Sequence, residues 1–271
     1  MFLGKQVRLN RLTHAKSGKF VAITVDHAIA RGVLPGLVNM KETIDKVVAG
    51  RPDAMTMHKG IAENFFWPQA GKISLILKAT SFAPYHRNYD TPVADVEEAL
   101  RLGADAISIG VIVGEEGQAE QLTHLARVGK EAQAAGLPLI SHIYPRGSAI
   151  KDAKDPEAVA YAVRAAAELG VDIIKTNWNG SAAKFRKAVL AASPARVVLA
   201  GGAEGENIRA YLQMTYEGME AGIFGVTFGR FVWGDANPAR AIAAVKAIVH
   251  EGSDIDAALK VYQEARLGAS V

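Results

Sequence analysis

Cysteine is absent from this chain of 271 residues. Its absence excludes disulfide bonds, metal sites built on thiolates and a cysteine nucleophile, and it is consistent with a reducing compartment. No stretch approaches the roughly 18 apolar residues that a transmembrane helix needs. Residues 1–9 also lack the apolar core and small-residue cleavage site of a secretion signal. We therefore expect a cytoplasmic protein with no membrane partner.

The chain also lacks a strong excess of one charge, since 31 Lys and Arg residues face 28 Asp and Glu residues. The basic residues are scattered and form no run interleaved with aromatic residues, the pattern that would indicate nucleic-acid binding. We therefore expect no nucleic-acid partner. With 49% hydrophobic residues and no linker rich in Gly, Ser or Pro, the chain can bury one large core. We predict a single domain over residues 1–271.

Eight short apolar runs recur along the chain, and each is followed by a segment with a helical pattern. The runs are continuous rather than alternating, which is typical of strands covered on both faces. Strict alternation of strands and helices predicts a (β/α)8 TIM barrel. The alternative is an open doubly wound sheet, which the absence of G-x-G-x-x-G after the first run makes less favourable. The predicted strands are 20–25, 54–57, 73–77, 106–109, 137–143, 171–175, 196–200 and 225–228.

Three segments lie outside this repeat. The first twenty residues are mixed and polar, and we predict a lid or a short helix before the barrel. Residues 81–90 have a polar and aromatic loop composition, and Pro92 after them predicts a helix that begins there, because proline is favoured in the first turn. Two closing helices are predicted at 238–250 and 255–266.

The active sites of such barrels lie at the carboxyl ends of the strands. Here the predicted strands end in ionisable residues or glycines, although the strands themselves are apolar. This concentration is the strongest indication in the sequence that the chain is an enzyme. The strand ends are Asp26-His27, His58-Lys59, Lys78, Gly110, Tyr144, Lys175, Gly201-Gly202 and Gly229-Arg230.

Lys175 ends a strand that is expected to be buried. Burial disfavours the charged form of an amine, and a neutral amine can attack a carbonyl to form a Schiff base. The structural alternative is a lysine whose charged head reaches solvent from the strand end. Lys59 and Lys78 also end strands, so position alone leaves them as rivals for the nucleophile.

Two further strand ends carry groups suited to proton transfer. The phenol of Tyr144 can act as a general acid or base. The carboxylate of Asp26 can move protons on and off a nitrogen, while His27 orients it or binds substrate hydroxyls. The alternatives are a tyrosine packed at the barrel rim and an aspartate that caps the following loop.

Glycines follow the last two predicted strands, where barrels frequently bind phosphate through backbone N–H groups. Gly201-Gly202 and Gly229 allow the backbone to approach an anion closely, and Arg230 adds a bidentate donor. The alternative is that these glycines only permit tight turns.

The histidines form neither an H-E-x-x-H motif nor a close ligand pair. Histidines from three strand ends remain able to meet at one zinc ion, so metal-assisted chemistry stays an alternative. The site that we favour contains neither a metal nor a cofactor.

Taken together, these motifs resemble the class I aldolases of the archaeal fructose-bisphosphate aldolase type, a group that includes 2-amino-3,7-dideoxy-D-threo-hept-6-ulosonate synthase. The similarity runs in order over nearly the whole chain from about residue 18. The matching motifs are Val25-Asp26-His27, Met57-His58-Lys59-Gly60, Tyr144-Pro145-Arg146-Gly147, Asp172-Ile173-Ile174-Lys175-Thr176, Ala200-Gly201-Gly202, Gly229-Arg230 and Ile248-Val249-His250.

The resemblance implies a role for each catalytic position. Lys175 matches the Schiff-base lysine, Tyr144 the proton donor and Asp26 the proton acceptor. It further implies a phosphorylated ketose or ketone as substrate, reversible carbon–carbon cleavage without a metal, and rings of identical subunits, possibly decamers. The positions that match substrate and phosphate contacts are residues 26–30, which include His27, then Tyr144-Pro145-Arg146, Gly201-Gly202 and Gly229-Arg230.

Two other functions remain as alternatives. One is a transfer reaction on the same scaffold, either transaldolase-type condensation or acyl transfer to a thiol carrier, and the other is a sugar-phosphate sensor without catalysis. Departures from the family pattern concern the substrate contacts and leave the Schiff-base motif intact. They are Ala28 for the usual Gly, Ala203-Glu204 for Pro-Lys, Phe231 for Asn, and Gly110 for the histidine of the synthase subgroup.

Overall fold

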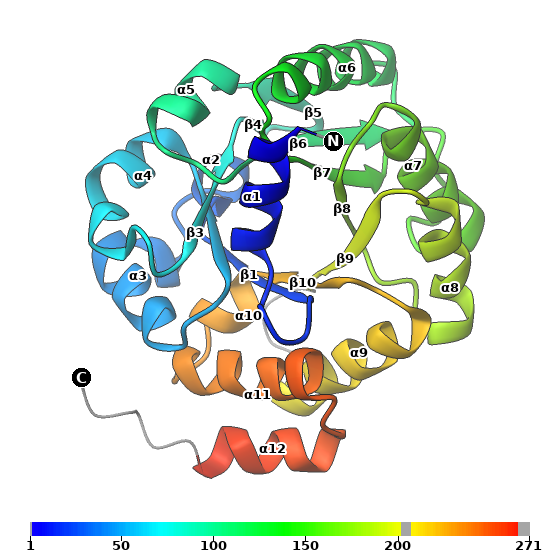
Figure 1. Cartoon of the computed structure of the whole chain (residues 1–271). Coiled ribbons are helices and arrows are strands. Elements are labelled where there is room, and N and C mark those ends of the chain that lie inside the picture. Colours follow the sequence, from blue (N-terminus) through cyan, green and yellow to red (C-terminus); the bar gives the residue numbers. More distant parts are fainter. Residues whose placement is uncertain (1, 202–206, 265–271) are drawn as a thin grey trace.

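The computed structural model describes residues 2–201 and 207–264. Eight parallel strands form a closed barrel, surrounded by helices in Figure 1, in the order β1-β10-β9-β8-β7-β6-β3-β2. The predicted TIM barrel is therefore confirmed. Its strands are β1 (Phe20–Thr24), β2 (Ala54–Met57), β3 (Ser74–Lys78), β6 (Ala106–Val113), β7 (Leu139–Pro145), β8 (Ile173–Thr176), β9 (Arg196–Ala200) and β10 (Gly225–Phe228).

The helices begin and end where local chemistry favours it. Asp155 accepts a hydrogen bond from the N–H of Ala158, and Pro156 occupies the first turn of α7. Gly222 ends α9 in the left-handed conformation that glycine adopts readily. The main helices are α1 (Leu3–Leu12), α2 (His27–Arg31), α3 (Met40–Ala49), α4 (Lys59–Phe65), α5 (Val96–Arg101), α6 (Gln118–Ala134), α7 (Pro156–Glu168), α8 (Ala182–Ala191), α9 (Ile208–Ala221), α10 (Arg230–Trp233), α11 (Pro238–Glu251) and α12 (Ile255–Glu264). Within the described ranges, none of them is long and apolar enough to cross a membrane.

Helix α1 closes the amino-terminal end of the barrel, and in Figure 1 it crosses the centre of the ring of helices. Leu12 is fully buried among barrel residues such as Phe20 and Ile173. Lys5 lies 2.8 Å from the carboxylate of Asp172, and the backbone oxygen of Arg11 accepts a hydrogen bond from the side chain of Ser74. Of the two predicted alternatives, the short helix before the barrel is confirmed. The lid is wrong, because these contacts hold the helix at the end opposite the strand termini that carry the ionisable residues.

We expect Leu12→Ala to lower the free energy of unfolding by roughly 2–5 kcal/mol, because it leaves a cavity in a fully buried cluster. Urea denaturation measures this change. Leu3→Ala on the same helix is the matched control, since Leu3 is 75% exposed, and its effect should stay within about 0.5 kcal/mol. Equal effects of the two substitutions would contradict the closing role of α1.

The segment predicted as a loop forms an antiparallel hairpin instead. Its strands are β4 (Thr80–Ala83) and β5 (His86–Pro92), and it packs against β6. Pro92 ends β5 rather than starting a helix, because a strand end tolerates the missing N–H. Helix α5 begins at Val96, after Asp95 accepts a hydrogen bond from the N–H of Glu98.

Candidate active site at the carboxyl ends of the strands

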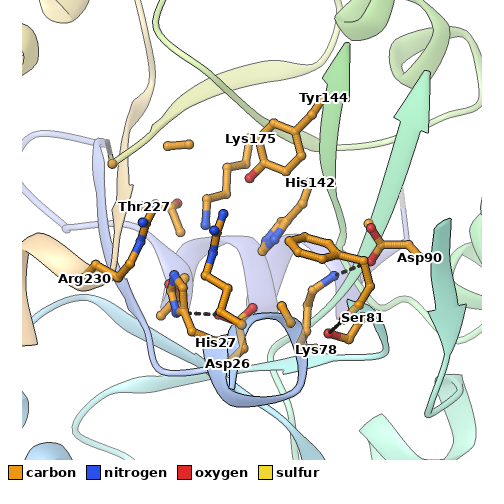
Figure 2. Close-up of a pocket in the computed structure, with 18 of the residues that line it drawn as sticks. Asp26, His27, Lys78, Ser81, Asp90, His142, Tyr144, Lys175, Thr227 and Arg230 are labelled. Atoms are coloured by element: carbon orange, nitrogen blue, oxygen red, sulfur yellow. Dashed lines mark hydrogen bonds and ion pairs between the residues drawn. The ribbon is translucent and has the colours of Figure 1, made fainter. Parts of the chain in front are cut away.

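The carboxyl ends of the strands surround a pocket with about 750 Å³ of space, including its open mouth (Figure 2). Gly202, together with Ala203 and Glu204, lies outside the described residues. Of the positions matched to substrate contacts, Ala28, Ile29 and Pro145 do not line the pocket. The catalytic and binding residues predicted for the site that line it are Asp26, His27, Tyr144, Arg146, Lys175, Gly201, Gly229 and Arg230.

Lys175 extends from β8 into this pocket and is only 7% exposed. Among residues 2–201 and 207–264, its amine makes no ion pair and no side-chain hydrogen bond. Burial lowers its pKa to about 8, and the positive charges of Lys78 and Arg230 act in the same direction. An ordinary lysine has a pKa of about 10.4, so Lys175 holds a far larger fraction of neutral amine near neutral pH.

The other two candidate lysines are engaged elsewhere. Lys59 is half exposed, lies 2.7 Å from Glu98 and does not line the pocket. Lys78 does line the pocket, but its amine donates to the hydroxyl of Thr80 at 3.0 Å and lies 3.6 Å from Asp90. Lys175 is therefore the lysine whose geometry suits a nucleophile.

Asp26 occupies the position before α2, but its side chain makes no capping hydrogen bond. The alternative that Asp26 caps the following segment is therefore wrong. Burial opposes its ionisation, yet His27, Lys175 and Lys78 together hold its pKa below the usual range. The pocket thus contains a carboxylate that stays ionised, with Oδ1 of Asp26 lying 3.4 Å from Nδ1 of His27.

Tyr144 lies one residue before the end of β7, and in Figure 2 its hydroxyl points toward the Lys175 side chain. Burial raises the pKa of this phenol well above its ordinary value, and the carboxylates of Asp26 and Asp90 raise it further. A phenol in this state stays protonated and can donate. The site therefore combines a proton acceptor with a proton donor around one amine.

Histidines near the pocket are neutral. Burial lowers the pKa of His27 to about 4 and that of His142 well below its ordinary range. His142 lines the pocket but escaped the sequence analysis, although it precedes Tyr144 by two positions and so faces the same side of the strand. In the part of the chain that the structure describes, no group of three or more His, Asp and Glu side chains is arranged to hold a metal ion.

Three arginines give the pocket a positive mouth. Arg31 and Arg146 lie over the ring of Phe82 at 5.7 Å and 5.1 Å, and Arg230 lines the same pocket. Burial lowers the pKa of Arg31, as does the proximity of Arg230 and Arg146. Sequence reasoning missed Arg31 because it lies at the end of α2, beyond the strand end, and missed Phe82 because it lies in the hairpin.

Gly229 approaches β1 so closely that no other residue would fit. A Cβ atom built there would lie 2.4 Å from the ring of His27 and 2.7 Å from the hydroxyl of Thr24. The absence of a side chain thus brings the end of β10 against the end of β1, where Asp26 begins the next segment. This contact positions Arg230 at the pocket.

The model of the DeoC/LacD family of aldolases matches residues 20–235. The chain belongs to the DeoC/LacD family of aldolases. The expected resemblance and the prediction of a class I aldolase are thereby confirmed.

Alignments with two relatives extend over nearly the whole chain. The 2-amino-3,7-dideoxy-D-threo-hept-6-ulosonate synthase of Halobacterium salinarum is 35% identical over 94% of this chain and 95% of its own length. A class 1 fructose-bisphosphate aldolase of Halobacterium salinarum is 29% identical, covering 90% of this chain and 95% of that protein.

A solved structure extends this comparison to the chemistry of a relative. It is an archaeal fructose-1,6-bisphosphate aldolase with its catalytic lysine covalently bound to the carbinolamine intermediate of the substrate. It matches with a TM-score of 0.83 and 27% identity, over 90% of this chain and 99% of that chain. The barrel of this aldolase is therefore shared with an enzyme that works through a lysine.

Proposed function

We propose that Lys175 of this class I aldolase attacks the ketone of a phosphorylated sugar and forms a Schiff base. The observation that carries the proposal is a buried amine with a pKa of about 8, placed between Tyr144 and Asp26 and bonded to neither. The protonated imine withdraws the electrons of the adjacent carbon–carbon bond, which leaves an enamine on Lys175 and releases an aldehyde.

Asp26 and Tyr144 handle the protons of this sequence. The ionised carboxylate of Asp26 assists proton transfers at nitrogen and oxygen as the imine forms. As the carbon–carbon bond forms, the protonated phenol of Tyr144 donates its proton to the aldehyde oxygen, and in cleavage the phenolate takes that proton back from the hydroxyl. The opposite directions of their pKa shifts support this division of roles, because Asp26 is ionised as a proton acceptor and Tyr144 is protonated as the donor for bond formation.

Phosphate is held at the end of the pocket formed by β9 and β10. Arg230 supplies a charged fork, and Gly201 and Gly229 allow the backbone to approach the anion. Arg146 and His27 complete the substrate contacts that we propose. Held at this end, the phosphate would align the ketone carbon with the Lys175 amine.

A transaldolase-type reaction is the second candidate, and the observation that favours it is the greater identity with the relative named as a synthase. With fructose 1,6-bisphosphate and no acceptor, an aldolase releases triose phosphates over many turnovers, whereas a transferase stops after at most one equivalent per active site. Binding without turnover, unaltered in Lys175→Ala, would instead support a sensor. A cytoplasmic homo-oligomer belongs to the same proposal, and native mass measurement would give its subunit number.

Borohydride reduction in the presence of a ketose phosphate tests the proposal directly. We expect a mass increase on the peptide that contains Lys175. The trapping rate should rise with pH and level off above about 8, because only the neutral amine attacks. An ordinary lysine would show a rise that continues to about pH 10.4. Adducts on another side chain, or none at all, would overturn the assignment.

A further inference from the structure

The hairpin β4–β5 carries a buried carboxylate into the pocket. Asp90 is 5% exposed and lines the pocket, although it belongs to neither a barrel strand nor a barrel helix. Its backbone N–H donates to the side-chain oxygen of Gln121, which also accepts from the N–H of Ile112 on β6. The hairpin is thus tied to the barrel wall, and the position of Asp90 is built into the fold.

A compact network engages one oxygen of this carboxylate. The hydroxyl of Thr80 donates to Oδ1 of Asp90 at 2.9 Å and accepts from Lys78 at 3.0 Å. Lys78 also lies 3.6 Å from the same oxygen, so it compensates the negative charge. Within residues 2–201 and 207–264, no donor reaches the second oxygen, Oδ2. A carboxylate that is nearly buried therefore offers an unused acceptor at a ligand pocket.

Gly110 on β6 leaves the space that this carboxylate occupies. A Cβ atom at this position would lie 2.1 Å from Oδ1 and 2.6 Å from Oδ2 of Asp90. Any side chain at position 110 would therefore displace the carboxylate from its present place. The two residues act as one feature of the pocket, although they are separated along the chain.

Figure 2 shows Asp90 and Arg230 on opposite sides of Lys175. When Arg230 holds the phosphate of the ketone half and Lys175 holds the carbonyl carbon, the chain beyond the cleaved bond extends toward Asp90. We propose that Oδ2 of Asp90 accepts a hydrogen bond from a hydroxyl group of the aldehyde half, which makes Asp90 a specificity-determining residue for hydroxylated aldehydes. This inference rests on the proposed Schiff base at Lys175.

The charge balance of the network decides which group Asp90 recognises. Because Lys78 already compensates the carboxylate, a cationic substrate gains little net attraction, whereas a hydroxyl donor still gains a charge-assisted hydrogen bond. An aldehyde without hydroxyls would bury Oδ2 with no donor, which is unfavourable. The pocket therefore discriminates against apolar aldehydes.

Condensation of dihydroxyacetone phosphate with glyceraldehyde or with propanal tests the inference, because these aldehydes have the same carbon skeleton. The readout is the kcat/KM for glyceraldehyde divided by the kcat/KM for propanal. Comparing this ratio between variants cancels the difference in intrinsic reactivity of the two aldehydes. We expect Asp90→Ala to lower this ratio by roughly 10- to 100-fold, as for loss of a hydrogen bond to a charged group. The KM for dihydroxyacetone phosphate should stay unchanged.

Two further variants keep the test independent of folding defects in Asp90→Ala. Asp90→Asn is isosteric and replaces the acceptor Oδ2 by an NH2 group, so the ratio should fall by about tenfold. Gly110→Ala keeps the carboxylate but displaces it, and should lower the ratio as well. Glu120→Gln is the control, since this exposed side chain accepts a hydrogen bond from Tyr89 and does not line the pocket, and it should leave the ratio unchanged.

Borohydride trapping with dihydroxyacetone phosphate alone distinguishes failure at Asp90 from failure at Lys175. If every variant forms the Lys175 adduct and the ratio is unchanged, the role of Asp90 is overturned while the aldolase remains. The role of Asp90 is overturned as well if the wild type forms the borohydride-trapped adduct with dihydroxyacetone phosphate but condenses it with neither aldehyde. If the wild type forms no adduct, the Schiff-base proposal fails and the inference falls with it.

Discussion

Lys175→Met will abolish carbon–carbon bond cleavage while the barrel remains folded. The covalent imine is the electron sink of the whole sequence, so no partial reaction bypasses it, and kcat/KM should fall by at least roughly 10⁴-fold. Methionine fills the buried site without a group that burial penalises, so the denaturation midpoint should not fall. Cleavage of fructose 1,6-bisphosphate and intact mass after borohydride reduction are the two measurements.

The other strand-end lysines provide the controls. Lys59→Met should change kcat/KM by less than about twofold, because Lys59 forms an exposed ion pair with Glu98, and such pairs contribute little. Lys78→Met should still form the Lys175 adduct, since Lys78 does not bond to the substrate carbon. Activity retained in Lys175→Met, or an adduct that survives this substitution, would place the nucleophile on another residue.

The barrel was predictable because its strands are buried on both faces. Such strands appear in the sequence as short continuous apolar runs, and β2, β9 and β10 begin and end at the residues expected. The hairpin β4–β5 was not predictable by this criterion, because most of β5 is exposed or half-buried and its residues are largely polar. Pro92 then indicated a helix start, although Asp95 is the residue that caps α5.

The site was predictable wherever a barrel strand delivers a side chain directly. Lys175, Tyr144 and the residues after β1 follow from the rule that barrel sites lie at the carboxyl ends of strands. The rule did not separate Lys175 from Lys59. Two positions beyond the end of β2 the chain has already entered α4, and the Lys59 side chain pairs with Glu98. It also gave no signal for Asp90 or Arg31, which lie in segments beyond the strand ends.

Tyr144→Phe separates the two halves of the proposed reaction. Loss of a positioned proton donor typically lowers a rate by about 10²- to 10⁴-fold, and we expect kcat for cleavage to fall within this range. The phenylalanine ring keeps the shape of the site, and Lys175 retains its amine. Borohydride should therefore still trap the adduct, in an amount equal to or greater than that of the wild type.

Tyr161→Phe is the matched control, because Tyr161 on α7 is 52% exposed, its hydroxyl accepts a hydrogen bond from Gln118, and it does not line the pocket. The pH profile adds a second criterion for Tyr144. Since burial keeps its phenol protonated beyond the ordinary range, the wild-type rate should show no alkaline decline from this group below about pH 10. If Tyr144→Phe loses both adduct trapping and cleavage, the phenol is required for the steps that form the imine. Asp26 would then be the group that transfers the proton during cleavage of the carbon–carbon bond.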